Sequence, residues 1–391
     1  MTSHVPGPAA REEIAKGRIV EAQVARASEV LRSEGANPVV SAELKAGPLP
    51  RGWPWIVVSG STEAVSLLEG RFVDVWGPGE GSVAYPEEPV LQIAGRYAEF
   101  AELTTALVGT MSYASGVASA AARLKLAAGG RPVYAAASRM VHPAVVPVEE
   151  HAAYVGGCDG VTTIPGAEQV GRDPVLTMDH DVALILGVPR AWQAFDRLIE
   201  DGVPRIATVD TLVDERTGAL AAAETLGQEL RAIRIEMAGT VDEVARTVRE
   251  VRWELDARGH GEVEIVLAGD LDEQAVKTLA RQVDGFCVVA PLASAPPVPF
   301  VLDLVEVDGR PVARRGRLSG RKTLWRCEDC GNRGIAPERA RPEGCPRCGT
   351  KLTGLLAPLL RRGAVDQAPP SPSAARDRTL QEVAAAVNPF L

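Results

Sequence analysis

The chain has 391 residues, of which 46 % are hydrophobic and 24 % charged, and its formal net charge is −9. At roughly 100–200 residues per domain, this length predicts two or three domains with a large core. An acidic protein is a poor candidate for sequence-independent nucleic-acid binding, which needs clustered Lys and Arg. The N-terminus lacks the apolar region of a secretory signal and no run of about 18 apolar residues follows, so we expect a cytoplasmic protein without a membrane span.

The first hundred residues combine strand patterns with Pro and Gly turns. Strands are predicted at 37–44, 55–59, 72–75 and 90–93, and a long helical stretch at 99–129. Two more strands are predicted at 300–307 and 310–314, with Asp308-Gly309 as the hairpin turn between them. We expect an α+β sandwich domain over residues 1–110, completed by residues of about 300–325.

The middle of the chain, residues 111–299, alternates strand and helix patterns. Strands are predicted at 132–138, 160–164, 182–186, 205–211, 232–236, 263–268 and 285–290. Amphipathic helical stretches lie between most of them, and Asp270 is a candidate N-cap for the helix over 271–283. Continuous apolar strands separated by helices favour a parallel sheet. We expect an irregular (β/α) barrel, with an open doubly wound sheet as the alternative.

Polar side chains follow several of these strands, at the edge where α/β proteins carry their sites. Strands commonly end where polar loops begin, so one such residue says little, but several in register are informative. The residues are Ser138, Arg139, Thr162, Thr163, Asp210, Thr211, Glu236, Gly269 and Asp270.

Four of the six cysteines form two Cys-x2-Cys pairs, Cys327 with Cys330 and Cys345 with Cys348, fourteen residues apart. Two such turns direct four thiolates to one point, which predicts a structural zinc ribbon over residues 326–353. A nucleic-acid-binding ribbon is the rival interpretation, because the loop carries several arginines. The other cysteines, Cys158 and Cys287, lie in apolar runs and are expected to be buried. Residues 363–391 are rich in Pro and Ser and are expected to form a flexible tail, with a short helix near 379–387 as the alternative.

Nine short segments between residues 12 and 352 carry a family resemblance. They are FVDVWGPGEG (72–81), EPVLQIAG (88–95), SG (115–116), ASRMVHP (137–143), GGCDG (156–160), LTMDH (176–180), VDT (209–211), DLDE (270–273) and DLVEVDG (303–309). In this order and spacing, followed by the cysteine ribbon, they resemble the archaeal-type nicotinate phosphoribosyltransferases.

The resemblance implies an α/β fold of the type II phosphoribosyltransferase kind and a homodimer or higher homo-oligomer. It implies an enzyme of NAD salvage that joins nicotinate to phosphoribosyl pyrophosphate to give nicotinate mononucleotide. Mg²⁺ would accompany the phosphoribosyl pyrophosphate, and ATP hydrolysis would be an accessory.

The resemblance also implies roles for individual residues. Arg139 matches the arginine that binds the nicotinate carboxylate, His180 the histidine that ATP can phosphorylate, and Asp210 an acid beside the ribose. The bland alternatives are a salt-bridged strand end for Arg139 and a solvated histidine between two aspartates for His180. The complete predicted set is His180, Asp210 and Glu236 as catalytic residues, and Ser138, Arg139, His142, Thr177, Thr211, Arg234, Gly269 and Asp270 as substrate-binding residues.

The chain departs from the family pattern at several of these segments. The N-terminal aromatic residue is missing in the stretch 20–23, Met140 replaces a second arginine, and Asp179 enters the loop before His180. The glycine-rich phosphate loop has become Cys287-Val-Val-Ala-Pro291, in which Pro291 has no N–H to donate. Three hypotheses follow: a divergent but working nicotinate phosphoribosyltransferase, a catalytically impaired paralogue acting as a regulatory or scaffolding subunit, or a phosphoribosyltransferase for a different heteroaromatic acid.

Overall fold

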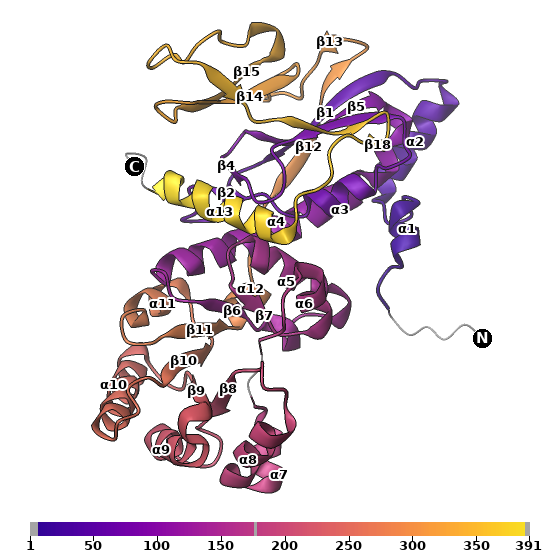
Figure 1. The fold of residues 1–391 in the computed structure, drawn as a ribbon. Coiled ribbons are helices and arrows are strands. Elements are labelled where there is room, and N and C mark those ends of the chain that lie inside the picture. The colour runs from indigo at the N-terminus through magenta and orange to yellow at the C-terminus, as the bar shows by residue number, and fades with distance from the viewer. Residues whose placement is uncertain (1–6, 176–177, 388–391) are drawn as a thin grey trace, which may run out of the picture. The chain divides into compact units, whose positions relative to one another are not determined.

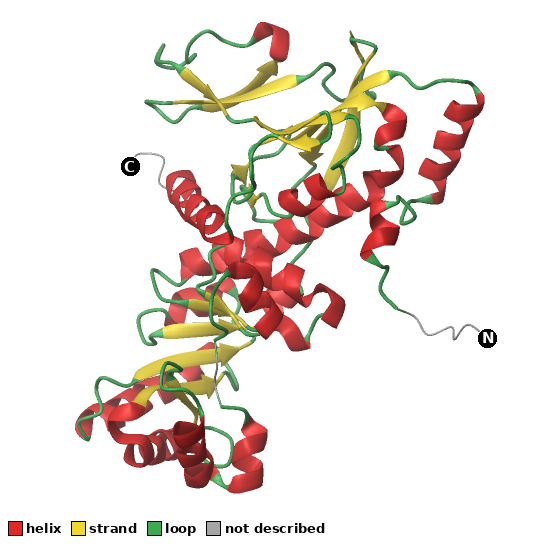
Figure 2. Cartoon of the chain, turned by 45° about the vertical axis from the view of Figure 1, so that its right-hand side comes forward, coloured by secondary structure: helices red, strands yellow, loops and turns green. Residues whose placement is uncertain are grey.

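The computed structural model describes residues 7–175 and 178–387 and divides the chain into two compact units. Unit 1 comprises residues 1–119 and 296–391, and unit 2 comprises residues 120–295 (Figures 1 and 2). The long helix α4 (Thr104–Ala127) begins in unit 1 and ends in unit 2. The division therefore falls inside this helix, close to the boundary expected at residue 110.

Unit 1 is built on a seven-stranded antiparallel sheet of order β13-β12-β1-β5-β3-β17-β18. Alternate residues of β1, from Val40 to Ala46, face an apolar core with α4. The two segments predicted to complete this domain do so, because β12 pairs along the whole of β1. The strands are β1 (Val39–Ala46), β3 (Val73–Gly77), β5 (Pro89–Arg96), β12 (Phe300–Val307), β13 (Arg310–Pro311), β17 (Ala357–Arg361) and β18 (Ala364–Val365).

The smaller elements of unit 1 surround this sheet. They are a two-stranded sheet of β2 (Ile56–Val57) and β4 (Val83–Ala84), a three-stranded sheet of β14 (Lys322–Cys327), β15 (Arg333–Pro337) and β16 (Leu352–Gly354), and helices α1 (Arg11–Ala15), α2 (Ala22–Ser33), α3 (Ser61–Ser66) and α13 (Pro372–Val387).

Helix α13 corrects the expectation of a flexible tail over residues 363–391. Its Ala375, Thr379 and Val383 are buried, at the spacing of one helix face. Thr379 Oγ1 donates to the carbonyl of Gly81 at 3.0 Å, and Glu382 accepts from the N–H of Val83 at 2.8 Å. Composition indicated disorder because the segment before α13 is rich in proline. The helix is ordered by these long-range contacts, which composition does not reveal.

The three-stranded sheet is attached to the large sheet by buried ion pairs. Lys322 Nζ lies 2.8 Å from Glu43 Oε2, with both side chains less than 5 % exposed. Arg333 forms an ion pair with Glu88 at 2.7 Å. Charges removed from water in this way must be paired, so these contacts tie the cysteine-bearing strands to the domain.

Unit 2 is a six-stranded parallel sheet of order β7-β6-β11-β10-β9-β8. In the described chain, strands that are consecutive in sequence are neighbours except β7 and β8, and β6 also pairs with β11. The strands therefore follow the cyclic order of a (β/α) barrel that is open between β7 and β8. Among the described residues β7 and β8 do not pair, which leaves a half-barrel. The strands are β6 (Val133–Ala135), β7 (Gly160–Val161), β8 (Arg205–Thr208), β9 (Leu230–Glu236), β10 (Glu264–Gly269) and β11 (Gly285–Val288).

Helices connect these strands and cover the sheet (Figure 1). Two of them correct the sequence predictions. Residues 182–186, predicted as a strand, belong to α7, because Asp179 caps a helix there by accepting from the N–H of Asp181. Asp270 does not cap a helix, because α11 begins at Glu273 with Asp272 as its N-cap. The helices are α5 (Val146–Val155), α6 (Ile164–Val170), α7 (His180–Leu186), α8 (Val188–Leu198), α9 (Glu215–Leu226), α10 (Val241–Ala257), α11 (Glu273–Leu279) and α12 (Ala290–Ala293).

Within residues 7–175 and 178–387, no helix has the length and apolar character that crossing a bilayer requires.

Candidate functional site

Five of the predicted site residues meet at the carboxyl ends of β8 and β9. The ring of His180, the first residue of α7, lies with Nδ1 2.9 Å from Thr211 Oγ1 and with Nε2 3.3 Å from Arg234 Nη1. Arg234 also forms an ion pair with Glu236. Asp210 accepts a hydrogen bond of 2.6 Å from the backbone N–H of Glu236. Residues from the start of α7, from the segment after β8 and from the end of β9 thus form one continuous polar chain.

Strand pairing explains why these side chains share a face. Arg234 and Glu236 are two residues apart on β9 and therefore point the same way. Ala268 on β10 lies in register with Glu236 on one side and with Cys287 of β11 on the other. The alternate residues Ile233 and Ile235 are buried on the opposite face of the sheet. The polar face is therefore the inner face of the half-barrel.

Gly269 ends β10 beside this cluster and has a φ of +118°, which L residues rarely adopt. A Cβ atom at this position would stand 3.2 Å from Glu236 Oε1. The position therefore needs glycine both for its backbone conformation and for the space next to the Glu236 carboxylate. Asp270 follows it as an exposed residue.

One carboxylate oxygen of the cluster is left without a partner in the described part of the chain. Asp210 Oδ1 is shielded from solvent and has no hydrogen bond, while Asp210 Oδ2 is satisfied by Glu236. An unpartnered buried oxygen costs free energy unless a ligand or water supplies a donor. Asp210 is thus prepared to accept from a hydroxyl group at the strand ends.

Arg139 lies at the end of the 3₁₀ turn Ala137–Arg139 after β6 and is bound by an acidic residue. Its Nη2 contacts Asp179 Oδ2 at 2.9 Å, and 86 % of its side chain is exposed. The backbone N–H of Asp181, together with Arg139, lowers the pKa of the Asp179 carboxyl. A substrate carboxylate would therefore have to compete with Asp179, a residue that departs from the family pattern.

The remaining predicted residues lie outside the polar chain. Ser138 is half-buried in the same 3₁₀ turn as Arg139. His142 is exposed and its Nδ1 accepts from the N–H of Ala144 at 3.1 Å, so it caps its own loop. This agrees with a structural turn, the alternative interpretation of the His-Pro pair. Thr177 lies outside the described residues.

The segment from Cys287 to Pro291 offers few donors to an anion. Burial raises the pKa of the Cys287 thiol to about 11, so the thiol stays protonated and unreactive near neutral pH, as expected. The N–H of Val289 already donates to the carbonyl of Gly269 at 3.2 Å. Pro291, inside α12, has no N–H. A phosphate at this loop would therefore find fewer backbone donors than in a glycine-rich loop.

Glu150 is a buried residue that the sequence patterns missed. Its Oε1 accepts from the N–H groups of Thr162 and Thr163, both at 3.0 Å, and so fixes the end of β7. The neighbouring Glu149 is fully buried and both its oxygens lack a partner in the described chain. Burial, reinforced by Glu150, raises the pKa of Glu149 to about 8. Two adjacent acids in an apolar helical stretch were the available signal.

The four paired cysteines come together in one cluster near the ends of β14 and β16. Their sulfur atoms all lie within 4.8 Å of one another, with separations of 3.4 Å for Cys327 and Cys348 and 3.6 Å for Cys330 and Cys345. Four thiolates at about 2.3 Å from a tetrahedral zinc ion stand roughly 3.8 Å apart. The cluster therefore has the size and donor set that a structural zinc ion requires.

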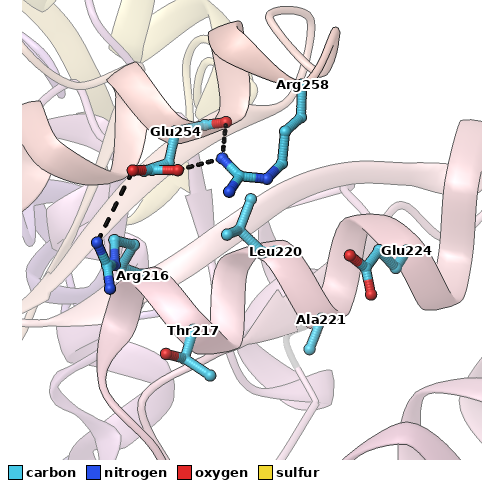
Figure 3. A pocket seen from close by; sticks show the side chains of 7 residues that line it. All are labelled: Arg216, Thr217, Leu220, Ala221, Glu224, Glu254 and Arg258. Carbon is cyan, nitrogen blue, oxygen red and sulfur yellow. Dashed lines mark hydrogen bonds and ion pairs between the residues drawn. The ribbon is translucent and has the colours of Figure 1, made fainter.

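A surface groove of about 330 Å³ lies between α9 and α10, and none of the predicted site residues lines it (Figure 3). Glu254 forms ion pairs with both Arg216 and Arg258 there, so these charges are paired within the protein (Figure 3). The groove therefore has no unpaired cation in this triad to attract an anionic substrate.

Comparisons with known proteins agree with this architecture. Residues 23–115 match the model of the quinolinate phosphoribosyl transferase N-terminal domain, and residues 117–303 match that of its C-terminal domain. The strand-end cluster and the half-barrel both fall within the second match.

Individual relatives are similar over most of the chain. Nicotinate phosphoribosyltransferase pncB1 of Mycobacterium tuberculosis is 31 % identical, over 85 % of this chain and 83 % of that protein. A solved nicotinate-nucleotide pyrophosphorylase from Pyrococcus furiosus is 41 % identical, with a TM-score of 0.93 and 98 % of both chains covered. Human nicotinic acid phosphoribosyltransferase, at 19 % identity and a TM-score of 0.74 over 93 % of both chains, shares the fold. The chain belongs to the type II phosphoribosyltransferases, the family of the quinolinate phosphoribosyl transferase domains.

Proposed function

We propose that this protein joins nicotinate to phosphoribosyl pyrophosphate, giving nicotinate mononucleotide and pyrophosphate in NAD biosynthesis. The observation that carries the proposal is the continuous chain from His180 through Arg234 and Glu236 to Asp210 at the strand ends. Cations, carboxylates and a histidine in one place suit a substrate that carries phosphates and ribose hydroxyls. The similarity to nicotinate phosphoribosyltransferases of Mycobacterium tuberculosis supports the choice of nicotinate.

In this proposal each residue has a role that its surroundings support. Asp210 Oδ1 accepts from a ribose hydroxyl, because it is buried without a partner in the described chain. Arg139 binds the nicotinate carboxylate by exchanging Asp179 for it, with the fork geometry that suits a carboxylate. Gly269 leaves space next to Glu236 for the sugar or its phosphate. His180 is the group that ATP would phosphorylate, and Mg²⁺ would accompany the pyrophosphate.

Quinolinate is the second candidate substrate, because both matching family models carry its name. Quinolinate has two carboxylates where nicotinate has one, so it needs more cationic partners. Here Met140 follows Arg139, and Arg139 itself is already paired with Asp179. The limited positive charge beside Arg139 supports nicotinate, which has a single carboxylate, as the substrate.

A catalytically impaired paralogue, serving as a regulatory or scaffolding subunit, is the third candidate. The donor-poor segment from Cys287 to Pro291 and the ion pair between Arg139 and Asp179 both favour it. Either feature weakens an interaction that catalysis needs, while the fold is unaffected.

A product assay separates the three candidates. The purified protein is incubated with phosphoribosyl pyrophosphate, Mg²⁺ and either nicotinate or quinolinate, with and without ATP, and mononucleotide is measured. We expect nicotinate mononucleotide from the wild type. In Asp210→Asn we expect the rate of product formation to fall at least tenfold, because the interaction with the ribose hydroxyl, on the order of 1.4 kcal/mol, is removed. Product from quinolinate alone would select the second candidate. No product, together with no heat on titration with millimolar phosphoribosyl pyrophosphate, would select the third.

We further propose that the four-cysteine cluster binds Zn²⁺ and has a purely structural role. Four protein ligands leave no open coordination position for a substrate. Lys322 and Arg333 join the ribbon to the N-terminal sheet through ion pairs, and this attachment favours a structural role over nucleic-acid binding.

A cytoplasmic homodimer is the assembly that we propose for the active protein.

A further inference from the structure

Both ring nitrogens of His180 have a partner, and the partners differ in kind. Arg234 Nη1 lies 3.3 Å from Nε2, and Thr211 Oγ1 lies 2.9 Å from Nδ1. A guanidinium group has only N–H donors and cannot accept a hydrogen bond, whereas a hydroxyl can do either. Nε2 must therefore be the accepting nitrogen of the neutral ring. The hydrogen of the neutral ring then resides on Nδ1, which donates to Thr211 Oγ1.

The opposite arrangement is disfavoured by the same geometry. A ring with its hydrogen on Nε2 would direct an N–H group at the N–H group of Arg234 across 3.3 Å. Thr211 could adapt by rotating its hydroxyl, but Arg234 could not, because its only ring-facing atoms are donors. Arg234 also cannot turn away without cost, since Glu236 holds its Nη2.

The partners of the ring are held independently of the ring itself. Thr211 directly follows Asp210, whose carboxylate binds the backbone of Glu236 at 2.6 Å. His180 is fixed at the start of α7 by the cap that Asp179 provides. The ring is therefore placed in a frame built from β8, β9 and α7, and the frame selects the ring's tautomer.

We propose that Arg234 selects the neutral Nδ1–H tautomer of His180, and that Thr211, which accepts this hydrogen, is a positioning residue that orients the ring. This assigns Thr211 to the support of His180 instead of to substrate binding. The lone pair of Nε2 then faces Arg234, and Nε2 is the ring nitrogen that can accept a proton or an electrophile. The choice of the acting nitrogen rests on the proposed function, whereas the tautomer does not.

Nitrogen-15 NMR of histidine-labelled protein tests the tautomer without any assay of activity. The chain has five histidines, so the His180 signals are assigned by their loss in His180→Gln. At a pH where the ring is neutral, we expect a protonated Nδ1 and an unprotonated Nε2 in the wild type and in Thr211→Ser. In Thr211→Val we expect Nδ1 to stay protonated, because Arg234 still excludes a hydrogen on Nε2, and we expect the Nδ1–H resonance to shift, because its hydroxyl acceptor is lost. Thr225→Val is the control, because Thr225 Oγ1 donates to the carbonyl of Ala221 in α9, at 2.6 Å.

Two results would overturn the proposal: a wild-type His180 with its hydrogen on Nε2, or an Nδ1–H resonance that Thr211→Val leaves unchanged. Val has nearly the shape of Thr, and the remaining histidine signals report whether the variant keeps its fold. Arg234→Met is the second variant. It should yield both tautomers, because Thr211 can pair with either, and an unchanged Nδ1–H ring in that variant would remove Arg234 from the argument.

The kinetic consequence is tested separately. Thr211→Val should lower kcat for mononucleotide formation about tenfold and leave KM for nicotinate within about twofold, and Thr211→Ser should restore kcat. A rise in KM with unchanged kcat would instead make Thr211 a substrate ligand and contradict the proposal. If the wild type forms no product, the proposed function fails, and the NMR result still decides the tautomer.

Discussion

The cysteine cluster of unit 1 and the strand-end cluster of unit 2 are built in opposite ways. All four sulfur ligands come from residues 327–348, and each pair is brought together by a local turn. The strand-end cluster joins His180, Thr211 and Arg234 from separate elements of the half-barrel: the start of α7, the segment after β8, and β9. A site made of local turns can be recognised from spacing alone. A site made of strand ends exists only once the sheet has formed, and small local changes decide its chemistry.

The largest effect is expected from removal of the metal. Structural zinc sites contribute folding free energy directly, so Cys345→Ser, or a strong chelator, should destabilise unit 1 by at least about 5 kcal/mol. Zinc analysis should give one ion per chain in the wild type, and a thermal unfolding transition should be lowered in Cys345→Ser. Cys158→Ser, outside the cluster, is the control for loss of a thiol. An equal stability of metal-free and metal-loaded protein would contradict a structural role.

The second effect tests how the ribbon is attached to the sheet. Lys322→Met leaves Glu43 buried and without its cation, which should cost roughly 3–5 kcal/mol of unfolding free energy. Replacing both residues, as Lys322→Met with Glu43→Leu, should recover most of this loss because no unpaired charge remains. Denaturant unfolding of the two single variants and the double variant measures the coupling. Additive losses would mean that the pair does not connect the two sheets.

The third effect concerns a buried acid near the strand ends of unit 2. The pKa of Glu149 is raised to about 8 when folded, so the folded state binds a proton that the unfolded state has already released above about pH 4.5. This contribution to stability is complete at acid pH and is lost as the pH rises to about 8. Between pH 6 and 8 the loss is roughly 2 kcal/mol. Glu149→Gln should remove this pH dependence, and an identical pH profile in both proteins would refute the assignment.

The smallest effect on stability, with a larger one on binding, is expected at the exposed pair of Arg139 and Asp179. Such a pair contributes only about 0–1 kcal/mol to folding. Asp179→Asn, which keeps the side-chain oxygen that caps α7, should therefore unfold like the wild type, yet bind nicotinate more tightly because Arg139 is released. Arg139→Ala should weaken nicotinate binding about tenfold. Calorimetric titration of both variants measures this, and equal affinities would remove Arg139 from the site.

Much of this protein could be predicted from its residue patterns. The apolar periodicity of the strands, the hairpin at Asp308-Gly309 and the cysteine spacing depend on near neighbours, and the structure confirms these elements. Three predictions failed where distant contacts or a cap outweighed composition. Residues 182–186 are helical because Asp179 caps α7. Asp272, and not Asp270, is the N-cap of α11. The tail forms α13 because this helix has hydrogen-bond partners elsewhere in unit 1.

The sequence by itself indicated an irregular (β/α) barrel and the clustering of four cysteines, because each depends on a period or a spacing within a short stretch. Only the tertiary structure decided that Thr211 and Arg234 contact opposite nitrogens of His180, that Asp179 pairs with Arg139, and that Asp210 Oδ1 is buried without a partner among the described residues. These contacts join residues 26 to 54 positions apart or depend on enclosure by the sheet. The physical reason is that strand register and burial set distances between side chains, and neither is a property of a local segment.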